Sequence, residues 1–452
     1  MDTLYEQARD VPVVARVDLC VVGGSCTGVF AAVAAARLGL SVALVEQGGF
    51  FGGVAAAGLV NIWHSTLDTE FRRPVIAGLT AETIDRLQRR GAADDTGPSE
   101  NVHYVLNTEE LKIELDELVT GAGVRPFLHA RFAAAVMADG IPVAAIIEDK
   151  SGRRAIRAAQ FIDATGDGDL VARAGLPVEA WDDLQPPTTC AVIRGIADIA
   201  QRNPGFNLGR AIFDPDGGAD VPAGFLWSRA CVGHPEDVMV AGTRVPGADC
   251  GDADQLTRAE IEGRRQVRAI CDLLRSRCEG GQDVSLVALP AMIGIRETRH
   301  ATCLHRLTER EVLDGVRFPD AVANGSYRVD VHHSDKPGLT FRYLDGRELY
   351  VVPGRETVKG RWRPEQAEDP TFYQIPYRSL VPRGARNVLV AGRLMDADRG
   401  AYGAVRVMVN CNQTGQAAGT AAWLAMDSGA DVADIDTDAL RQTLARQGAM
   451  II

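Results

Sequence analysis

The N-terminal part of the chain alternates between the pattern of a strand and that of a helix. Two short apolar runs, Val17–Val22 and Val42–Val45, are typical of strands that are buried on both faces of a parallel sheet. The alanine-rich segment between them has the composition of a helix and ends at Gly39. The pattern predicts a strand, a tight turn, a helix and a second strand, which is the repeating unit of an α/β fold.

Apolar and polar residues alternate with a period of two between residues 132 and 159. Three short runs are separated by the dipeptides Asp139-Gly140 and Ser151-Gly152, which favour hairpin turns. These runs predict an antiparallel meander, and an apolar strand is expected directly after it and again near the C-terminus. The predicted strands are Phe132–Met137, Val143–Glu148, Ala155–Ala159, Phe161–Gly166 and Asn387–Ala391.

Polar caps and glycine stops mark the ends of the longer helices. The expected helices are Leu79–Arg90, a helix from the capping box of Asn107 and Glu110 to Gly121, a helix capped by Thr257 and Glu260 that runs to Arg277, Asn412–Met426, and a last helix capped by Asp436 or Thr437. In the helix that ends at Arg277, the residues expected to face inward are Ile261, Val267, Ile270, Leu273 and Leu274.

The same patterns divide the chain into regions. α/β patterning covers residues 12–185 and returns over 376–452, which predicts one Rossmann-like domain with a β-meander, built from two parts. Residues 186–285 are rich in proline, and we expect an inserted substrate or cap domain there. Residues 286–350 are expected to supply strand ends and substrate-site side chains, and residues 351–375 a loop or lid.

Composition and charge exclude several classes of protein. The 452 residues are 46% hydrophobic and 24% charged, which is ordinary for a soluble globular protein, and the net charge of −12 argues against nucleic-acid binding. The N-terminus lacks the features of a secretory signal, and no uninterrupted apolar run reaches the roughly 18 residues of a membrane helix, so we expect a cytoplasmic protein without a membrane segment. Nine cysteines without a Cys-x-x-Cys pair argue against a disulfide framework or structural zinc.

The turn after the first strand has the chemistry of a dinucleotide site. Gly23 permits a tight turn and Gly28 permits close packing, so that the amides of the following helix face a pyrophosphate. Ser25 stands where the usual fingerprint has its second glycine, and Glu46 ends the second strand where a ribose-binding acid is expected. The turn predicts a bound dinucleotide, with a plain packing turn as the alternative.

Two later segments repeat this arrangement of an apolar strand followed by glycine and small residues. One is Asp163–Asp169, and the other combines Ala391–Arg393, Gly400–Arg406 and Asn412–Gly419. A calcium loop is an alternative for the first, but such loops span about twelve residues and end in Glu, whereas an apolar helix resumes here at Leu170. We therefore expect no metal, and three segments that bind one long nucleotide.

These segments, with Gly294–Arg299 and Ile375–Pro382, resemble the FAD-dependent oxidoreductase family, which is related to the fumarate reductase and succinate dehydrogenase flavoproteins and more loosely to glutathione reductase. The resemblance covers most of the chain outside 186–285 and implies an FAD-binding α/β fold. The residues that it implies for FAD are Gly23, Gly24, Ser25, Cys26, Thr27 and Gly28 at the pyrophosphate, Glu46 with Gln47 at the ribose, Gly52 and Gly53 on the flavin side, Thr165, Gly166 and Asp167 at the adenosine half, Gly392 and Arg393 near the ribityl chain, and Asn412, Thr414 and Gly415 at the start of a helix that stabilises reduced flavin.

Arginine, histidine and tyrosine near these segments are the candidates for substrate chemistry, because a flavin enzyme needs cations for a carboxylate or oxyanion and a base for a proton. We expect the cations to be Arg296, Arg299 and Arg406, the base to be His64, His300 or His332, and Tyr402 to face the flavin. The structural alternatives are ion pairing of Arg296, Arg299 and His300 with Glu297, packing of His64 beside Trp63, and a solvated loop at His332-His333.

Together these features predict an FAD-dependent dehydrogenase or oxidase that removes a hydride from a small hydroxylated or carboxylated metabolite. The alternatives are an ene-reductase of the fumarate reductase type and a flavin-binding regulatory module. The second half of the chain has no further dinucleotide fingerprint with its own acid, so oxygen, a quinone or a redox partner protein is expected as electron acceptor. A homo-oligomer is left open.

Overall fold

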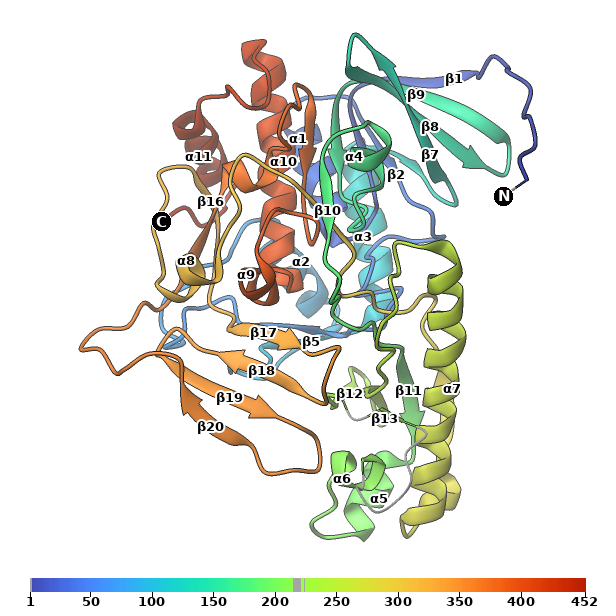
Figure 1. Cartoon of the computed structure of the whole chain (residues 1–452), viewed down its shortest axis with the longest axis vertical. Coiled ribbons are helices and arrows are strands. Elements are labelled where there is room, and N and C mark those ends of the chain that lie inside the picture. The colour runs from blue at the N-terminus through green and yellow to red at the C-terminus, as the bar shows by residue number, and fades with distance from the viewer. Residues whose placement is uncertain (1, 214–220, 223) are drawn as a thin grey trace.

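One seven-stranded sheet extends to the upper right of the molecule in the view of Figure 1. The computed structural model describes residues 2–213, 221–222 and 224–452. The strands follow the spatial order β6-β2-β1-β9-β8-β7, and β22 pairs with β9 beside this path. Their bounds are β1 (Val13–Val22), β2 (Val42–Val45), β6 (Arg125–Phe127), β7 (Arg131–Ala138), β8 (Ile141–Asp149), β9 (Gly152–Asp163) and β22 (Val388–Val390).

The middle of this sheet is parallel and buried on both faces. β1 pairs in parallel with β2 and β9, and β22 pairs in parallel with β9. Along β1, Leu19 and Val21 join one apolar cluster while Cys20 and Val22 join another, as expected for a strand covered on both sides. The first cluster includes residues of α1 (Cys26–Arg37), so the predicted strand-turn-helix-strand unit is confirmed.

The last strand of the predicted meander and the strand predicted after it are one continuous strand, β9. β8 pairs antiparallel with β7 and with the first half of β9, whereas the second half of β9 lies in the parallel sheet. The turn at Asp139-Gly140 has positive φ at both residues, as a tight hairpin turn requires. The expected break after Ala159 is absent, because Gln160 stays in register opposite Leu19.

Three predicted helices lie close to their expected positions. They are α2 (Leu79–Arg89), α3 (Thr108–Gly121) and α11 (Thr437–Arg446). The side chains of Asn107 and Asp436 accept backbone N–H groups in the first turns of α3 and α11, so both caps are confirmed.

Two helices begin earlier than predicted. α7 (Ala253–Arg277) is capped by Asp252 rather than Thr257, and Ile261 is 61% exposed instead of facing inward. α10 begins at Met408 and ends at Ser428, so Asn412 lies in its second turn. The first turn of α7 is mostly polar or small, and α10 begins after Val407, which makes no side-chain cap hydrogen bond, so no capping residue marks its start.

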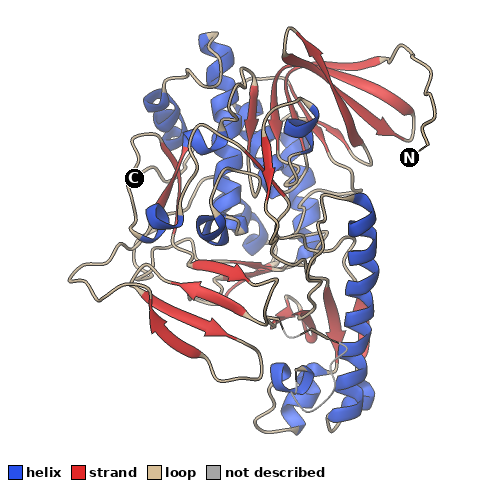
Figure 2. Ribbon diagram, viewed as in Figure 1, coloured by secondary structure: helices blue, strands red, loops and turns tan. Residues whose placement is uncertain are grey.

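Two four-stranded antiparallel sheets lie below the parallel sheet in the view of Figure 1, and α7 runs along one side of the molecule (Figure 2). The first sheet and its helices are β11 (Cys190–Arg194), β12 (Trp227–Cys231), β13 (His234–Ala241), β14 (Ser285–Ala288), α5 (Ile196–Arg202) and α6 (Leu208–Ile212). The second sheet is β17 (Val329–His332), β18 (Leu339–Arg342), β19 (Arg347–Val351) and β20 (Val358–Arg361). The domain boundaries stay predictions, but β14 runs past 285, and part of the loop expected over 351–375 is a strand.

Short elements connect these layers. They are β3 (Ile62–Trp63), β4 (Ala93–Asp95), β5 (Tyr104–Leu106), β10 (Val178–Ala180), β15 (Arg299–Ala301), β16 (Ala321–Gly325), β21 (Tyr373–Pro376), α4 (Asp169–Arg173), α8 (Glu309–Leu313) and α9 (Arg399–Val405). Within the described ranges, no helix combines the length and the apolar character needed to cross a membrane.

Candidate functional site

The three glycine-containing segments meet at one edge of the parallel sheet. Val22 lies opposite both Val45 and Asp163, and Asp163 also lies opposite Val390. The four strands β1, β2, β9 and β22 therefore end side by side, and the turns that follow them share this edge. Ligands of open α/β sheets bind at the carboxyl ends of strands.

The turn between β1 and α1 has no space for larger side chains. Gly23 has a φ of +104°, and a Cβ there would lie 2.4 Å from the carbonyl oxygen of Ala164. A Cβ on Gly28 would lie 1.8 Å from the carbonyl oxygen of Gly23. The Oγ of Ser25 caps α1 by accepting the N–H of Gly28 at 3.4 Å, which explains why serine replaces glycine here. The helix start leaves other amides for an anion.

Glu46 ties this turn to the loop that follows β2. Its Oε2 accepts the N–H of Gly24 at 2.7 Å, and its Oε1 accepts the N–H of Gly48 at 2.6 Å. Burial raises the pKa of Glu46, and the two amides oppose that shift. Each carboxylate oxygen has two lone pairs, so the group can still accept a ribose hydroxyl. Gln47, in contrast, is exposed.

The next glycine pair packs against the first turn. The N–H of Gly52 donates to the carbonyl oxygen of Gly24 at 2.9 Å, and a Cβ on Gly53 would lie 2.6 Å from the Cβ of Ser25. The thiol of Cys26 donates to the carbonyl oxygen of Gly52 at 3.7 Å. The two predicted parts of the site are therefore one rigid unit.

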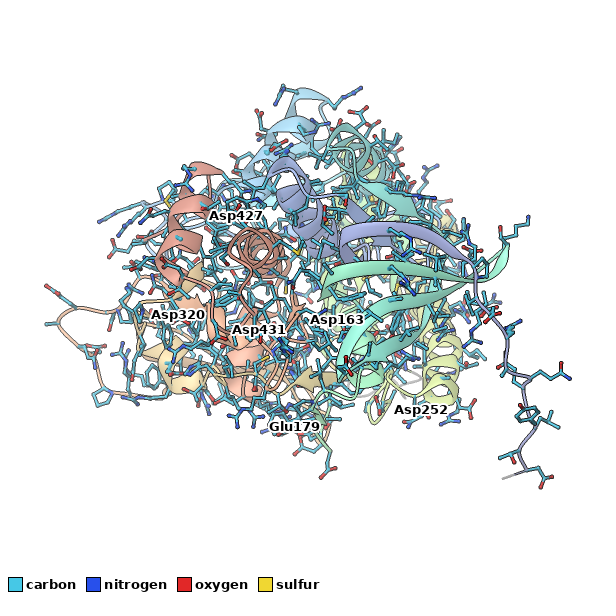
Figure 3. All side chains as sticks on the ribbon, turned by 90° about the horizontal axis from the view of Figure 1, so that it is seen from above. Asp163, Glu179, Asp252, Asp320, Asp427 and Asp431 are labelled. Carbon is cyan, nitrogen blue, oxygen red and sulfur yellow. The ribbon has the colours of Figure 1, made fainter. Side chains whose placement is uncertain are left out.

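Asp163 organises the segment after β9, and Figure 3 shows it well inside the outline of the molecule. Its Oδ1 accepts the N–H and the hydroxyl of Thr165, and its Oδ2 accepts the N–H groups of Leu170 and Val171. Burial raises the pKa of Asp163, and these hydrogen bonds lower it. The carboxylate is committed to the loop and to α4 rather than to a calcium ion.

Asp167 and Arg393 form an ion pair, although the sequence placed them at different parts of the cofactor. An Nη of Arg393 donates to Oδ1 of Asp167 at 2.6 Å, and the hydroxyl of Thr298 donates to the same oxygen at 2.7 Å. A Cβ on Gly166 would lie 2.8 Å from Nε of Arg393. The two side chains form one unit, and their placements at the adenosine half and the ribityl chain stay predictions.

The start of α10 borders the same edge. Asn412 is 1% exposed, and neither atom of its side-chain amide has a hydrogen-bond partner in the part of the chain that the structure describes. The hydroxyl oxygen of Thr414 accepts the N–H of Gly392 at 2.9 Å. A Cβ on Gly415 would lie 2.1 Å from the carbonyl oxygen of Thr27, so this glycine permits α10 to cross α1. The sequence predicts Gly415 at the start of this helix, but α10 begins seven residues earlier, at Met408.

A second group of predicted residues forms a buried polar cluster with Asp330, which no sequence motif indicated. An Nη of Arg406 lies 3.4 Å from Oδ2 of Asp330, and the hydroxyl of Tyr327 donates to the same oxygen at 3.0 Å. The hydroxyl of Tyr402 donates to the carbonyl oxygen of Arg296. We call Arg296, Tyr327, Asp330, Tyr402 and Arg406 the arginine cluster.

Local packing explains how the arginine cluster forms. A Cβ on Gly403 would lie 2.7 Å from the carbonyl oxygen of Asp330, so glycine lets α9 press against the backbone of β17. Arg296 is held by neutral acceptors, since one Nη donates to the carbonyl oxygen of Pro186 at 2.5 Å and to the hydroxyl of Thr188 at 2.6 Å. The expected alternative, pairing with Glu297, is not what the structure shows.

Positive charge exceeds negative charge in the arginine cluster. Burial and the nearby Arg406 lower the pKa of Arg296 to about 10, which leaves it charged at neutral pH. Burial on its own would raise the pKa of Asp330, but His332 and the guanidinium groups of Arg406 and Arg328 outweigh it and hold this pKa below its usual range. Two guanidinium groups therefore share one carboxylate, and the cluster favours an anion.

Two predicted histidines adjoin this cluster and are neutral. Nε2 of His332 lies 3.3 Å from Oδ1 of Asp330, and burial with Arg296 lowers the pKa of His332 to about 3. His64 packs on Tyr327 with ring centroids 4.2 Å apart, and burial with Arg328 lowers its pKa to about 3. His332 is 5% exposed, so the solvated-loop alternative is wrong for it. Both rings are therefore unprotonated at neutral pH and are weaker bases than a free imidazole.

Arg299 and His300 do not join the arginine cluster. Arg299 forms an ion pair with Asp169 at 2.9 Å. His300 is 2% exposed, with Nε2 3.1 Å from Oε1 of Glu297, and it touches the cluster only through the ring of Tyr402. For His300 this is the pairing with Glu297 that the sequence offered as the structural alternative.

A cavity of about 540 Å³ is lined by one member of the arginine cluster, Tyr327, whose hydroxyl contacts Asp330 of the cluster. His64, Tyr327 and Arg328 lie at its wall, together with the turn between β18 and β19 and residues 367–371. This volume is in the usual range for a metabolite-sized ligand. His64 thus stands between the cavity and the cluster, which no sequence motif could show.

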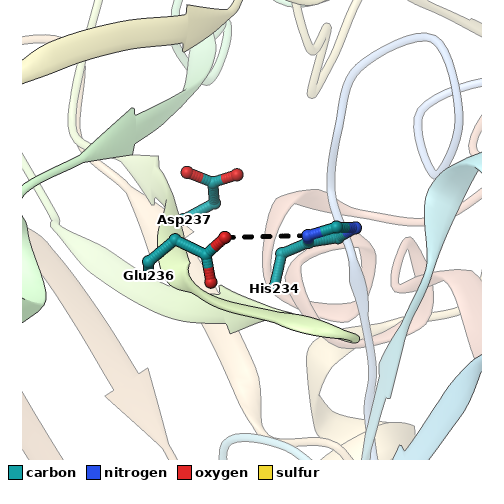
Figure 4. A group of neighbouring side chains, drawn as sticks. All are labelled: His234, Glu236 and Asp237. Carbon is teal, nitrogen blue, oxygen red and sulfur yellow. Dashed lines mark ion pairs between the residues drawn. The ribbon is translucent and has the colours of Figure 1, made fainter.

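Three neighbouring side chains in β13 are close enough together to suggest a metal ion: His234, Glu236 and Asp237 (Figure 4). The dashed pair in the figure joins Nδ1 of His234 to Oε1 of Glu236 at 3.8 Å. Both oxygens of Asp237 accept N–H groups of Arg194, at 2.7 and 2.9 Å. Because Arg194 already neutralises this carboxylate, the group is an exposed ion-pair network.

Parallel strands that end beside a glycine turn and two helix starts define a dinucleotide-binding α/β protein. The chain belongs to the FAD dependent oxidoreductase family, whose profile matches residues 18–444. It is therefore an FAD-dependent oxidoreductase, and FAD is its cofactor.

Comparison with other known proteins adds little beyond this. No curated protein matches the sequence. A geranylgeranyl bacteriochlorophyll reductase-like protein from Thermoplasma acidophilum is similar, with 13% identity over 96% of this chain and 84% of that chain and a TM-score of 0.46. A triple mutant of the flavin-dependent brominase Bmp2 has 10% identity over 95% and 84% of the two chains and a TM-score of 0.47. The myxobacterial chondrochloren halogenase CndH has 12% identity over 96% and 79% and a TM-score of 0.43.

The sheet edge fits FAD on its own chemistry. Gly23, Gly28 and Gly53 leave a backbone surface that a larger side chain would fill, and the amide of Asn412 is a buried polar group without a protein partner. Such groups need a hydrogen-bonding partner. The remaining assignments of single residues to parts of FAD stay predictions.

Proposed function

We propose that this enzyme oxidises a small hydroxylated or carboxylated metabolite by removing a hydride. The arginine cluster carries this proposal, because it is a buried site with surplus positive charge directly before the start of α10. FAD, when bound, supplies the acceptor for the hydride. The predicted cytoplasmic location, the acceptor that takes the electrons onward (oxygen, a quinone or a redox partner) and a homo-oligomeric state remain parts of the proposal.

In this account Arg296 and Arg406 bind the carboxylate or oxyanion of the substrate. Arg406 is held by Asp330, and the backbone at Arg296 is held by the hydroxyl of Tyr402, so both guanidinium groups are positioned before a substrate arrives. Preorganised cations of this kind stabilise developing negative charge without reorganisation. Arg299 and His300 have structural roles.

His64 takes the hydroxyl proton as the substrate carbon gives up its hydride. It lines the cavity, it is neutral, and its buried Nδ1 has no partner within the described residues. His332 is the weaker candidate, because its Nε2 is engaged by Asp330. The substrate loses two electrons with the hydride and one proton to the imidazole, so the reaction is balanced.

Anaerobic mixing of the FAD-loaded enzyme with a panel of hydroxy acids tests this function. The expected result is loss of the oxidised flavin absorbance with at least one of them, slowed about 100-fold or more in His64→Gln because general-base catalysis contributes roughly that factor. The matched control is His234→Gln, since His234 is 65% exposed and far along the chain in β13. An unchanged rate in His64→Gln would refute the role of this histidine.

The ene-reductase alternative uses the same cations in the opposite direction. An enzyme reduced with a viologen dye would then pass electrons to fumarate-like alkenes, and no hydroxy acid would bleach the flavin. A regulatory module would keep its flavin oxidised with every compound of either panel.

A further inference from the structure

We propose that the substrate is a zwitterion, with its anionic group at the inner end of the cavity and a cationic group at the mouth. This inference rests on the proposed function and narrows its substrate class. Short amino acids with a terminal amino group and a hydroxyl on the chain are the simplest members of this class, since the proposed reaction needs the hydroxyl.

The inner end of the cavity is positive. Arg328 lines it, is 5% exposed, and has an Nε without a partner within the described residues. Its other nitrogens donate to neutral oxygens, the carbonyl of Glu100 and the side chain of Asn101. Phe341 packs against the guanidinium at 3.8 Å. Tyr327 also lines the cavity and joins this end to the arginine cluster through Asp330, so the anion that the proposed function places at Arg296 and Arg406 enters past Arg328.

The mouth of the cavity is negative. Arg347 pairs with two of the lining carboxylates, Glu100 at 2.7 Å and Asp345 at 2.6 Å, and its single positive charge leaves one negative charge over. Two others keep their charge available. Glu368 is exposed and has no ion pair in the described part of the chain, and Glu70 pairs at 3.2 Å only with Arg72, a side chain that is 80% exposed.

A fifth lining carboxylate, Asp369, is neutralised by Arg363 at 2.6 Å. The spare negative charge therefore comes from Glu70 and Glu368, which are both exposed, together with the one charge left over on the Glu100 and Asp345 pair. A simple anion would pass these carboxylates before it reached Arg328, and a simple cation would meet Arg328 at the inner end. A molecule with both charges satisfies both ends, which is how charge complementarity produces specificity.

Calorimetric binding to the FAD-loaded enzyme tests the inference without turnover. The probes are the zwitterions glycine, β-alanine, γ-aminobutyrate and ε-aminocaproate, with caproate and hexylamine as single-charge controls. At least one zwitterion is expected to bind about fivefold or more tightly than either control, which is the upper range for one exposed ion pair. Equal or tighter binding of caproate, or no binding by any zwitterion, would overturn the inference.

Matched variants locate the two ends. The double variant with Glu70→Gln and Glu368→Gln is expected to lose the preference for the zwitterion over caproate. The control variant Glu365→Gln is expected to keep this preference, since Glu365 lies in the same segment and its side chain is 85% exposed. Arg328→Lys is expected to lower the binding affinity for both the zwitterion and caproate. If the double variant keeps the full preference, the carboxylates do not recognise a cation. Hydroxy acids that fail to bleach the flavin while these binding results hold would refute the proposed function alone.

Discussion

Asp330 connects more of the candidate site than any residue that a motif indicated. One oxygen of its carboxylate accepts from Tyr327 and pairs with Arg406, and the other lies beside His332. Its backbone oxygen also accepts an Nη of Arg406 at 3.3 Å. The position of Arg406, and through Tyr327 that of His64, depends on this carboxylate.

Asp330→Asn keeps the shape and removes the charge. Removing one member of a buried ion pair costs about 3–5 kcal/mol, so the free energy of unfolding should fall by that order, together with the rate of flavin reduction. Because the pKa of Asp330 is held below its ordinary value, the carboxylate is charged above the unfolded pKa of about 4, and the loss should be constant from about pH 5 to pH 8. Chemical unfolding at fixed FAD across this range measures it.

The matched control is Asp335→Asn, an exposed carboxylate in the same stretch of chain, which should change stability by less than about 0.5 kcal/mol. Equal stabilities of Asp330→Asn and the parent protein would show that Asp330 does not organise the cluster.

At the scale of elements, glycine sets the approach of α10 to α1. A Cβ on Gly419 would lie 2.0 Å from the carbonyl oxygen of Ala31, one turn beyond the contact of Gly415 with Thr27. This crossing holds the start of α10, with Asn412 and Thr414, against the sheet edge. Small residues in the sequence of α10 therefore serve packing first, and they position the cofactor edge as a consequence.

Gly419→Ala is expected to destabilise the protein by about 1–3 kcal/mol through overpacking and to weaken FAD retention, because the start of α10 must move. Urea unfolding at fixed FAD concentration and the FAD content after gel filtration measure both effects. Gly121→Ala is the control: its Cβ would meet nothing within 4 Å, so it should be neutral or stabilising by up to about 1 kcal/mol. Similar behaviour of the two variants would contradict the packing account.

Elements with strong local signals could be predicted from the sequence. The β1-α1-β2 unit, the Asp139-Gly140 hairpin and the caps at Asn107 and Asp436 all depend on residues within a few positions. The predicted starts of α7 and α10 are too late, because the first turn of α7 is mostly polar and the N-cap of α10, Val407, is not a capping residue. The continuity of β9 was missed, because one polar residue, Gln160, looks like a break until its partner strand is known.

At the scale of the whole molecule, the site is made of segments that only the fold brings together. Arg406 follows α9 in the C-terminal part, Asp330 lies in a sheet below the parallel one, and His64 follows the glycine-rich loop of the N-terminal part. The sequence could indicate the dinucleotide turn and the cations, since each has a local pattern. It could not indicate which cations are already paired: Asp169 holds Arg299 and Asp167 holds Arg393, each through a contact distant in sequence.

The central claim is that Arg296 and Arg406 form the anion site beside the flavin. The most direct measurement is a sulfite titration of the FAD-loaded protein, followed through loss of the oxidised flavin absorbance, because sulfite is an anion that reacts with flavin where positive charge is close. Arg296→Gln and Arg406→Gln should each lower the affinity of the bound flavin for sulfite by about tenfold or more, as expected for loss of a charged hydrogen-bond donor. Arg386→Gln, whose side chain is 60% exposed, should match the parent protein. Unchanged sulfite affinity in both cluster variants would contradict the account.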